Sequence, residues 1–190
     1  MKQAKVLSSN EFKRALAIAN SGRHSLRNCL ALQLSFLAGL RAKEIAALVI
    51  GDIFSVSGEV KTMVNLSAAQ TKGKKGRVFA VNDKLAAALQ AYYVEMGLGE
   101  LKRTTPLLRS QKGCAITPNS MVSIIKTIFE DAGIESATSH SGRRSFLTGL
   151  ADKGVGIHIL KELAGHANIQ TTARYLATSP TTLLNAANLL

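Results

Sequence analysis

Three kinds of side chain that suit phosphate chemistry are concentrated between residues 139 and 175. The chain reads Ser-His-Ser-Gly-Arg-Arg-Ser-Phe at 139–146, Leu-Ala-Gly-His at 163–166 and Thr-Thr-Ala-Arg-Tyr at 171–175. Arginine holds a phosphate through two parallel hydrogen bonds, histidine exchanges protons near neutral pH, and a tyrosine hydroxyl is a weak nucleophile that needs such help. The combination predicts attack of a tyrosine hydroxyl on a phosphodiester of DNA.

Helices are expected to carry these side chains. Ser139 is a candidate cap for a helix that presents His140 and Arg143, three residues apart, on one face. The next helix is expected to close at His166, and a third helix to carry Tyr175. A lone histidine at a helix end is more often structural, and a lone tyrosine on a helix is more often part of the core. The set as a whole favours a catalytic interpretation.

A further arginine, Arg41, follows a helix expected over residues 25–38, which is apolar almost all round and ends at Gly39. Arg41 is therefore held at the start of the next short helix, where an anion is favoured. Glu44 lies one turn further on. Two interpretations are open for this pair, a weakly stabilising exposed ion pair or an arginine placed to bind a phosphate.

Residues 51–81 change to a strand-like pattern, with turns expected at 57–58 and 73–76, and predict a small three-stranded antiparallel sheet. Four cations lie on or beside the second turn: Lys72, Lys74, Lys75 and Arg77. Such a tip is either an ordinary solvated loop or a contact to the phosphates of DNA, since glycine lets the backbone approach another polymer closely. The spacing of a P-loop is missing.

Composition sets the broad class. The chain has 190 residues, of which 46% are hydrophobic, so one sizeable domain with a core is expected. The predicted class is α+β, mostly α-helical with the small sheet. With 24 Lys and Arg against 12 Asp and Glu, the formal net charge of +12 favours an anionic partner, nucleic acid ahead of membrane. Ribosome binding or plain surface basicity is the alternative. Aromatic residues are only 5%, which argues against a stacking platform for single strands.

The two cysteines, Cys29 and Cys114, lack any paired spacing, so neither a zinc site nor a disulfide framework is expected, and a reducing cytosol fits. The first residues lack the apolar segment of a signal peptide. The longest apolar stretch, 29–40, is too short to span a bilayer. The prediction is a soluble cytoplasmic protein with no membrane partner and no metal site.

The order of five motifs resembles the catalytic domain of the tyrosine recombinase, or phage integrase, family. The motifs are Ala-Gly-Leu-Arg-x-x-Glu-Ile at 38–45, Thr-Lys-Gly at 71–73, His-x-x-Arg at 140–143, Gly-His at 165–166 and Thr-Thr-x-x-Tyr at 171–175. The resemblance covers about residues 8–176. It implies the fold of the family's catalytic domain, double-stranded DNA as partner, and no cofactor, neither metal nor ATP.

The resemblance also implies a role for each motif residue. Tyr175 resembles the nucleophile, which would form a 3′-phosphotyrosine. Arg41 and Arg143 resemble the two arginines that clamp the attacked phosphate. Charge develops on the non-bridging oxygens during attack, and two guanidinium groups match that geometry. His140 is the natural acceptor of the tyrosine proton.

The remaining roles complete the expected site. His166 is expected to donate to the phosphate oxygens, Lys72 to protonate the departing 5′-hydroxyl, and Glu44 to support the site. Four residues are expected to contact DNA: Lys74, Lys75, Arg77 and Arg144. The sequence departs from the family pattern at Gly142 and Arg144, where the family commonly has leucine and histidine. Spacing favours Arg143 over Arg144 as the residue that faces the phosphate.

Family members generally carry an N-terminal helical domain that closes around DNA, yet only 40 residues precede Arg41. We therefore expect residues 1–190 to form a single catalytic domain without that N-terminal core-binding domain. The sequence is then either a piece of a longer protein or a naturally single-domain member. The tail, about 177–190, packs on its own domain or docks on a neighbouring protomer of a homo-oligomer, a tetramer on DNA.

The expected function is site-specific DNA recombination, in which the protein cleaves and rejoins DNA through Tyr175. The alternative is an accessory protein on the same fold that binds DNA and never cleaves it. Presence of the whole set of polar groups favours cleavage. A topoisomerase that uses the same chemistry is a lesser alternative.

Overall fold

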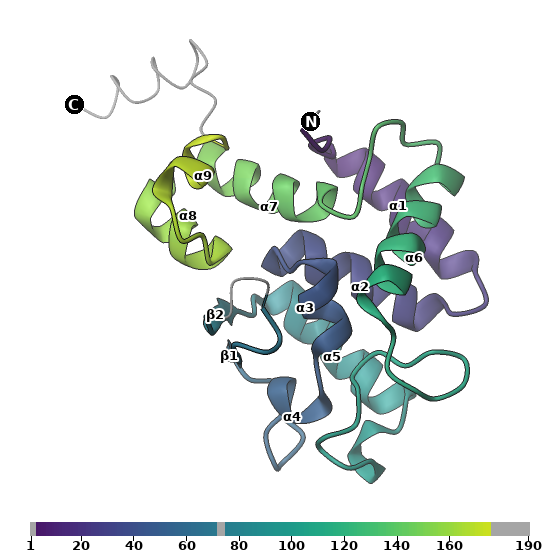
Figure 1. Ribbon diagram of the computed structural model, residues 1–190. Coiled ribbons are helices and arrows are strands. Elements are labelled where there is room, and N and C mark those ends of the chain that lie inside the picture. The colour runs from purple at the N-terminus through teal and green to yellow at the C-terminus, as the bar shows by residue number, and fades with distance from the viewer. Residues whose placement is uncertain (1–2, 72–74, 176–190) are drawn as a thin grey trace.

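The computed structural model describes residues 3–71 and 75–175, which form a mostly helical fold with one small antiparallel sheet (Figure 1). Up to the sheet the elements are α1 Ser9–Ser21, α2 Ser25–Ala38, α3 Ala42–Ala47, α4 Ile50–Ile53, β1 Met63–Leu66 and β2 Arg77–Ala80. They are followed by α5 Asp83–Glu95, the 3-10 turn η1 Leu98–Glu100, α6 Pro118–Asp131, α7 Ser141–Asp152, α8 Ile157–Ala164 and α9 Ile169–Ala173. The predicted site residues Lys72 and Lys74 and the tail from residue 176 lie outside the described residues.

The sheet has two strands within the described residues, where the sequence predicts three. Strands β1 and β2 pair antiparallel, with Met63 opposite Ala80. The prediction is wrong for the first strand, because that part of the chain forms α4. The apolar residues at the two ends of α4, Ile50 and Ile53, are both buried, and their three-residue spacing places them on one face of a helical turn. Phe54 then pairs with Val60 only at an isolated bridge.

Local signals set several helix ends as predicted. The hydroxyl of Ser8 accepts the Glu11 N–H at 3.2 Å, and the Glu11 carboxylate accepts the Ser8 N–H at 2.9 Å, so a capping box starts α1. Gly39 ends α2 in the left-handed conformation, with φ of 64°. A Cβ atom at Gly39 would meet the ring of Phe146 at 2.6 Å, so the close approach of α7 also requires glycine there.

The helices that carry the predicted site are shifted slightly from expectation. His140, rather than Ser139, is the residue before the first turn of α7. The reason is a local turn in which the Ser141 N–H donates to the Thr138 carbonyl at 2.8 Å and the Ser141 hydroxyl accepts the Thr138 N–H at 2.9 Å. Helix α9 ends before Tyr175, whose N–H closes the last turn.

Two apolar clusters stabilise the fold. The large one is formed by the helices from α1 through α6 and by the sheet. Helix α2 lies at its centre, and none of the residues of α2 is fully exposed. The small one is built from Leu147, Leu160 and Ala164, with Tyr175 packed against it. Helix α7 contacts α2 in the first cluster and α8 in the second, so it connects them. Figure 1 shows α8 and α9 gathered on one side of the molecule, next to β2. None of the described helices is both long enough and apolar enough to cross a membrane.

Candidate active site

Arg143 is the most deeply buried cation of the predicted set, with 3% of its surface exposed. Its Nη1 donates to the Gly39 carbonyl at 2.6 Å, and its Nη2 donates to the Ala164 carbonyl. These carbonyls lie at the C-terminal ends of α2 and α8, where the helix dipole is negative. Burial, with the nearby positive charges of Arg41 and Arg77, lowers the pKa of Arg143 to about 9. The guanidinium therefore stays charged at neutral pH and is held rigidly by two helix ends.

His166 stands beside this guanidinium, with its Nε2 atom 3.2 Å from Arg143 Nη2. Its other ring nitrogen, Nδ1, lies 3.0 Å from the hydroxyl of the buried Thr172. A guanidinium can only donate, so Nε2 is the acceptor and the proton of the neutral ring is on Nδ1. Burial, followed by the charges of Arg143 and Arg41, lowers the pKa of His166 to about 4. Without DNA, His166 is neutral and orients Arg143.

The ring of Tyr175 stacks on the ring of His166, with centroids 5.9 Å apart and planes 14° from parallel. The Tyr175 N–H donates to the Thr172 carbonyl at 2.9 Å. Thr172 thus contacts both residues, through its hydroxyl and its carbonyl. The predicted nucleophile is half-buried and directly follows α9, at a fixed position relative to His166.

Glu44 connects the other arginines. Both the N–H and the Nη1 of Arg41 donate to its carboxylate, at 2.8 and 3.0 Å. Arg77 donates to the same carboxylate twice, from Nη2 at 2.7 Å and from Nε at 3.1 Å. Burial raises the pKa of Glu44, but the hydrogen bonds and charge of Arg77, with those of Arg41, outweigh it and lower the pKa overall. Glu44 is fully buried, so the interpretation of the pair as a weakly stabilising exposed ion pair is wrong.

Arg77 has a different place from the one predicted. Its side chain is only 6% exposed, and its Nη1 donates to the Leu163 carbonyl at 2.8 Å. Arg77 therefore joins β2 to Glu44 and α8. It also lines the groove between β2 and α8, so its contact to DNA stays a prediction. The sequence contained a signal for this, because Arg77 is two residues before the buried Phe79 and so shares its face of the strand.

The predicted residues border one pocket of about 270 Å³. It is lined by Arg41, His140, Arg143, Arg144, His166 and Tyr175, with Gln3, Ala4, Thr171 and Arg174. Five of the six predicted catalytic residues thus come together, and the sixth, Lys72, is outside the described residues. The sequence reasoning missed Gln3 and Ala4, because no spacing links the N-terminal segment to the motifs. It included Thr171 and Thr172 in the Thr-Thr-x-x-Tyr motif but gave them no role.

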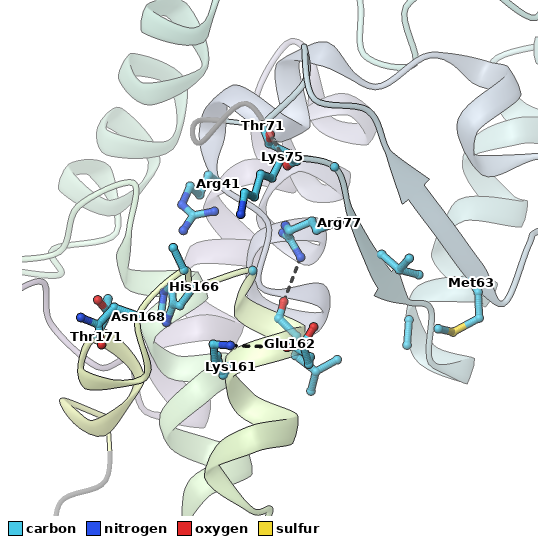
Figure 2. Close-up of a pocket in the computed structure, with 16 residues that line it drawn as sticks. Arg41, Met63, Thr71, Lys75, Arg77, Lys161, Glu162, His166, Asn168 and Thr171 are labelled. Carbon is cyan, nitrogen blue, oxygen red and sulfur yellow. Dashed lines mark hydrogen bonds and ion pairs between the residues drawn. The ribbon is translucent and has the colours of Figure 1, made fainter.

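A larger groove of about 950 Å³ continues from this pocket between β2 and α8. Figure 2 shows Arg41, Lys75 and His166 around one end of the groove. Lys75 is exposed at this groove, and its contact to DNA stays a prediction. Hydrogen bonds fix Thr71 and Lys75, the residues on both sides of 72–74. The Thr71 hydroxyl donates to the Lys75 carbonyl at 2.7 Å, and Lys43 Nζ donates to the Thr71 carbonyl at 2.8 Å.

The glycine at 142, which departs from the family pattern, has a packing reason. A Cβ atom there would lie 2.6 Å from the Ser35 hydroxyl and 3.0 Å from its Cβ, so α7 approaches α2 closely at this point. Ser35 is buried, and its hydroxyl has no hydrogen-bond partner among the described residues. A leucine would not fit here without moving one of the two helices.

Metal ligands do not gather anywhere in the described ranges: no group of three or more His, Cys, Asp or Glu side chains is placed to hold an ion. The titratable groups of the pocket are instead cations, two histidines and a tyrosine. Such a pocket can bind a phosphate, exchange a proton and supply a hydroxyl nucleophile.

Comparison with known proteins relates this geometry to others. The model of the phage integrase family matches residues 5–181. Tyrosine recombinase XerD of Oceanobacillus iheyensis is 31% identical over 174 residues, which are 90% of this chain and 56% of the relative. Tyrosine recombinase XerA of Pyrococcus horikoshii is 31% identical over 175 residues, with the same shares. This chain spans little more than half the length of these curated relatives.

Solved structures share the fold. The crystal structure of XerA recombinase aligns with a TM-score of 0.77 at 22% identity, over all of this chain and 64% of that one. XerH recombinase, bound to its difH substrate after cleavage, aligns with a TM-score of 0.73 at 24% identity, over 98% of this chain and 53% of that one. The catalytic domain of bacteriophage HP1 integrase aligns with a TM-score of 0.70 at 21% identity, over 98% of this chain and 95% of that one.

Proposed function

This chain belongs to the phage integrase family of tyrosine recombinases, and from that premise we propose that it cleaves and rejoins double-stranded DNA at specific sites through Tyr175. The observation that carries the proposal is the pocket in which Arg41, Arg143, His140 and His166 surround the nucleophile. On this view residues 1–190 act as one catalytic domain.

In the proposed cleavage step the Tyr175 oxygen forms a bond to phosphorus, and the bond from phosphorus to the 5′-oxygen of the next nucleotide breaks. The tyrosine proton passes to His140, which lines the same pocket. The departing oxygen takes a proton from Lys72. The product is a 3′-phosphotyrosine and a free 5′-hydroxyl. One phosphate ester replaces another, so attack by a second 5′-hydroxyl can reverse the step and rejoin the DNA.

Arg41 and Arg143 bind the non-bridging oxygens in this proposal. Fixed guanidinium groups stabilise the charge of the transition state without having to reorganise as it forms. Arg143 suits this role because two helix-end carbonyls fix its head. Arg41 suits it because its guanidinium is tied to Glu44 on one side and is 21% exposed on the pocket.

His166 enters the step through a change of state. Its Nε2 accepts from Arg143 in the DNA-free protein, so it has no proton there to offer. A bound phosphate would offset the positive charges that, with burial, depress its pKa, so that the ring takes up a proton on Nε2. The protonated ring would then donate from Nε2 to the phosphate while Nδ1 still donates to Thr172.

The experiment is covalent trapping on a nicked duplex that carries a candidate recombination site. Cleavage near the nick releases a short fragment, so the rejoining step fails and the protein stays attached. We expect an adduct on a denaturing gel with the natural chain and none with Tyr175→Phe, which keeps the ring stacked on His166. Adduct formation in the presence of a chelator would support a mechanism without a metal.

The second candidate, a DNA-binding accessory protein, predicts the opposite result. Such a protein would shift the duplex on a native gel and yet form no adduct on any nicked substrate. A duplex that binds tightly without trapping would therefore favour that candidate. We further propose assembly of four protomers on two DNA duplexes, which crosslinking of the DNA complex would test.

A further inference from the structure

The N-terminal segment 3–7 lies along α7, beside the pocket that contains Tyr175. Leu7 is buried, and its N–H donates to the Ser145 hydroxyl at 2.7 Å. Gln3 and Ala4, at the other end of the segment, form part of the pocket wall. The chain therefore places a segment of its own against the surface on which the proposed phosphate chemistry occurs.

Arg144 is the residue that holds this segment. Its Nη1 donates to the Ala4 carbonyl and its Nη2 donates to the side-chain oxygen of Gln3. Its neighbour Arg143 uses its own two nitrogens on carbonyls that belong to buried helix ends. The partners of Arg144 are of another kind, because Gln3 is exposed and Ala4 lies in an irregular segment whose other hydrogen bond to α7, among the described residues, is that of the Leu7 N–H.

Two oxygen atoms on the two terminal nitrogens of a guanidinium are also what a phosphate group offers. The Ala4 and Gln3 oxygens are neutral, whereas the non-bridging oxygens of a phosphodiester carry a negative charge. The guanidinium is attracted to that negative charge, an attraction that the neutral Ala4 and Gln3 oxygens do not offer. A phosphate that entered the pocket would therefore displace the segment from Arg144 at a net gain.

A second cation lines the same pocket. Arg174 directly precedes Tyr175, is exposed, and makes no side-chain hydrogen bond to any residue that the structure describes. Arg41 and Arg143 already account for the attacked phosphate in the proposed function. Arg144 and Arg174 are thus two cations of the pocket that have no role in the proposed cleavage step.

We propose that Arg144 and Arg174 bind the DNA phosphate next to the one that Tyr175 attacks, and that Gln3 and Ala4 occupy Arg144 until DNA binds. The inference rests on the proposed function for the identity of the ligand. It adds a second phosphate subsite to the pocket, and it makes the N-terminal segment a competitor of DNA.

The test is a double-mutant cycle on DNA affinity. All chains carry Tyr175→Phe, so binding is measured without cleavage, by fluorescence anisotropy of a labelled duplex over a range of salt. Arg144→Ala is compared in the full chain and in a chain that starts at Val6, and thermal melting checks that each variant is folded. Shortening also removes two lysines. Their effect on affinity cancels in the cycle, because Arg144→Ala is always compared with a parent chain of the same length.

In the shortened chain, we expect Arg144→Ala to weaken binding roughly tenfold and to reduce the salt slope by about 0.9, the value for one phosphate contact. In the full chain, Arg144→Ala should weaken DNA binding by less than about threefold. The parent chain has to release the segment from Arg144 before DNA binds, and the variant does not. In a full chain that also carries Gln3→Ala, the loss from Arg144→Ala should be intermediate, because the segment then holds Arg144 less tightly. Arg174→Ala should weaken binding by the same factor in both chains, since nothing covers it among the described residues.

Lys126→Ala serves as the matched control, because Lys126 is an exposed cation on α6 that pairs with Glu130 and lines none of the pockets described above. It should change neither affinity nor slope in either chain. Equal losses for Arg144→Ala in both chains would overturn the occupation by the segment, and no loss in either would overturn the subsite. If the protein traps DNA through Tyr175 but gives either of these results, this inference is wrong and the proposed function still stands.

Discussion

Glu44 and Arg77 form a two-point ion pair inside the protein, with Nη2 and Nε of the arginine 2.7 and 3.1 Å from the carboxylate oxygens. The same carboxylate also accepts from the main chain and side chain of Arg41. A single buried acid thus joins β2 to the residue that starts α3. Arg41 owes its position at the pocket to a pair whose acid is fully buried and whose arginine side chain is only 6% exposed.

We predict that Glu44→Gln destabilises the fold by about 3 kcal/mol, because it leaves the buried Arg77 without a charged partner. The free energy of unfolding in urea measures this. Glu95→Gln on the exposed side of α5 is the matched control and should change stability by less than about 0.5 kcal/mol. Similar values for the two variants would contradict the role given to Glu44.

Glu44 also sets a pH window. Its pKa is lowered in the folded protein, so the stabilisation is complete above the ordinary value of 4.5 and is lost as pH falls through the folded pKa. The natural chain should therefore lose stability below about pH 4.5, and Glu44→Gln should lose less over the same range. Urea titrations of both chains in this acid range compare the two slopes.

Protonation of His166 should lower the stability of the fold at a higher pH than protonation of Glu44 does. Its pKa falls from the ordinary 6.5 to about 4 on folding, so the unfolded chain takes up a proton first. Stability contributed by the neutral ring is complete above pH 6.5 and falls as the pH drops towards 4. Between about pH 7.5 and pH 5 we expect a loss of about 1 kcal/mol, a figure reduced for solvent screening of the half-exposed ring.

His166→Asn provides the comparison, because asparagine keeps a donor near Thr172 and does not titrate. Its unfolding free energy should vary less over the same pH range than that of the natural chain. If the unfolding free energy of both chains falls by the same amount, another group causes the loss, and the lowered pKa assigned to His166 is wrong.

Arg143→Lys is expected to affect both stability and chemistry. A lysine has one nitrogen where Arg143 uses two, so at least one of the Gly39 and Ala164 carbonyls loses its donor. We expect a loss of about 2 kcal/mol in stability and at least about a hundredfold fall in the rate of adduct formation. Chemical denaturation and covalent trapping measure the two effects, and Tyr175→Phe should show the second without the first.

Ser35→Ala is expected to stabilise the protein. The Ser35 hydroxyl is buried at the contact of α2 with α7 and has no partner among the described residues, so its removal recovers the cost of desolvation. We expect about 1 kcal/mol, or a rise in Tm of roughly 2–4 °C. An unchanged or lower Tm in a calorimetric scan would indicate that the hydroxyl has a partner, such as an ordered water molecule.

The helices and the motif residues could be read from the sequence because their signals are local. The capping box at Ser8, the glycine after α2 and the proline at the start of α6 each act within one helical turn. The first strand was predicted wrongly because a short apolar run suits a strand and a helical turn alike. The turn at Thr138 that moves the start of α7 also has no distinct pattern in the sequence.

The long-range contacts could not be predicted in this way. The bond of Arg144 to Ala4 joins residues 140 positions apart, and the bond of Arg77 to the Leu163 carbonyl joins residues 86 apart. Charge placed both arginines on the list of DNA contacts, yet each binds an acceptor of the protein itself. Which partner an arginine takes depends on what the fold brings near it, and a count of cations contains no such information.

The small apolar cluster that packs against Tyr175 implies that different parts of the protein unfold locally at different free energies. Leu147, Leu160 and Ala164 are few compared with the cluster around α2, so α8 and α9 should unfold locally at a lower free energy than the rest. Amide hydrogens there should exchange with solvent long before those of α2. Tyr175 would then move on a shorter timescale than Arg41, which Glu44 of α3 holds, and it would leave and return while that arginine stays in place.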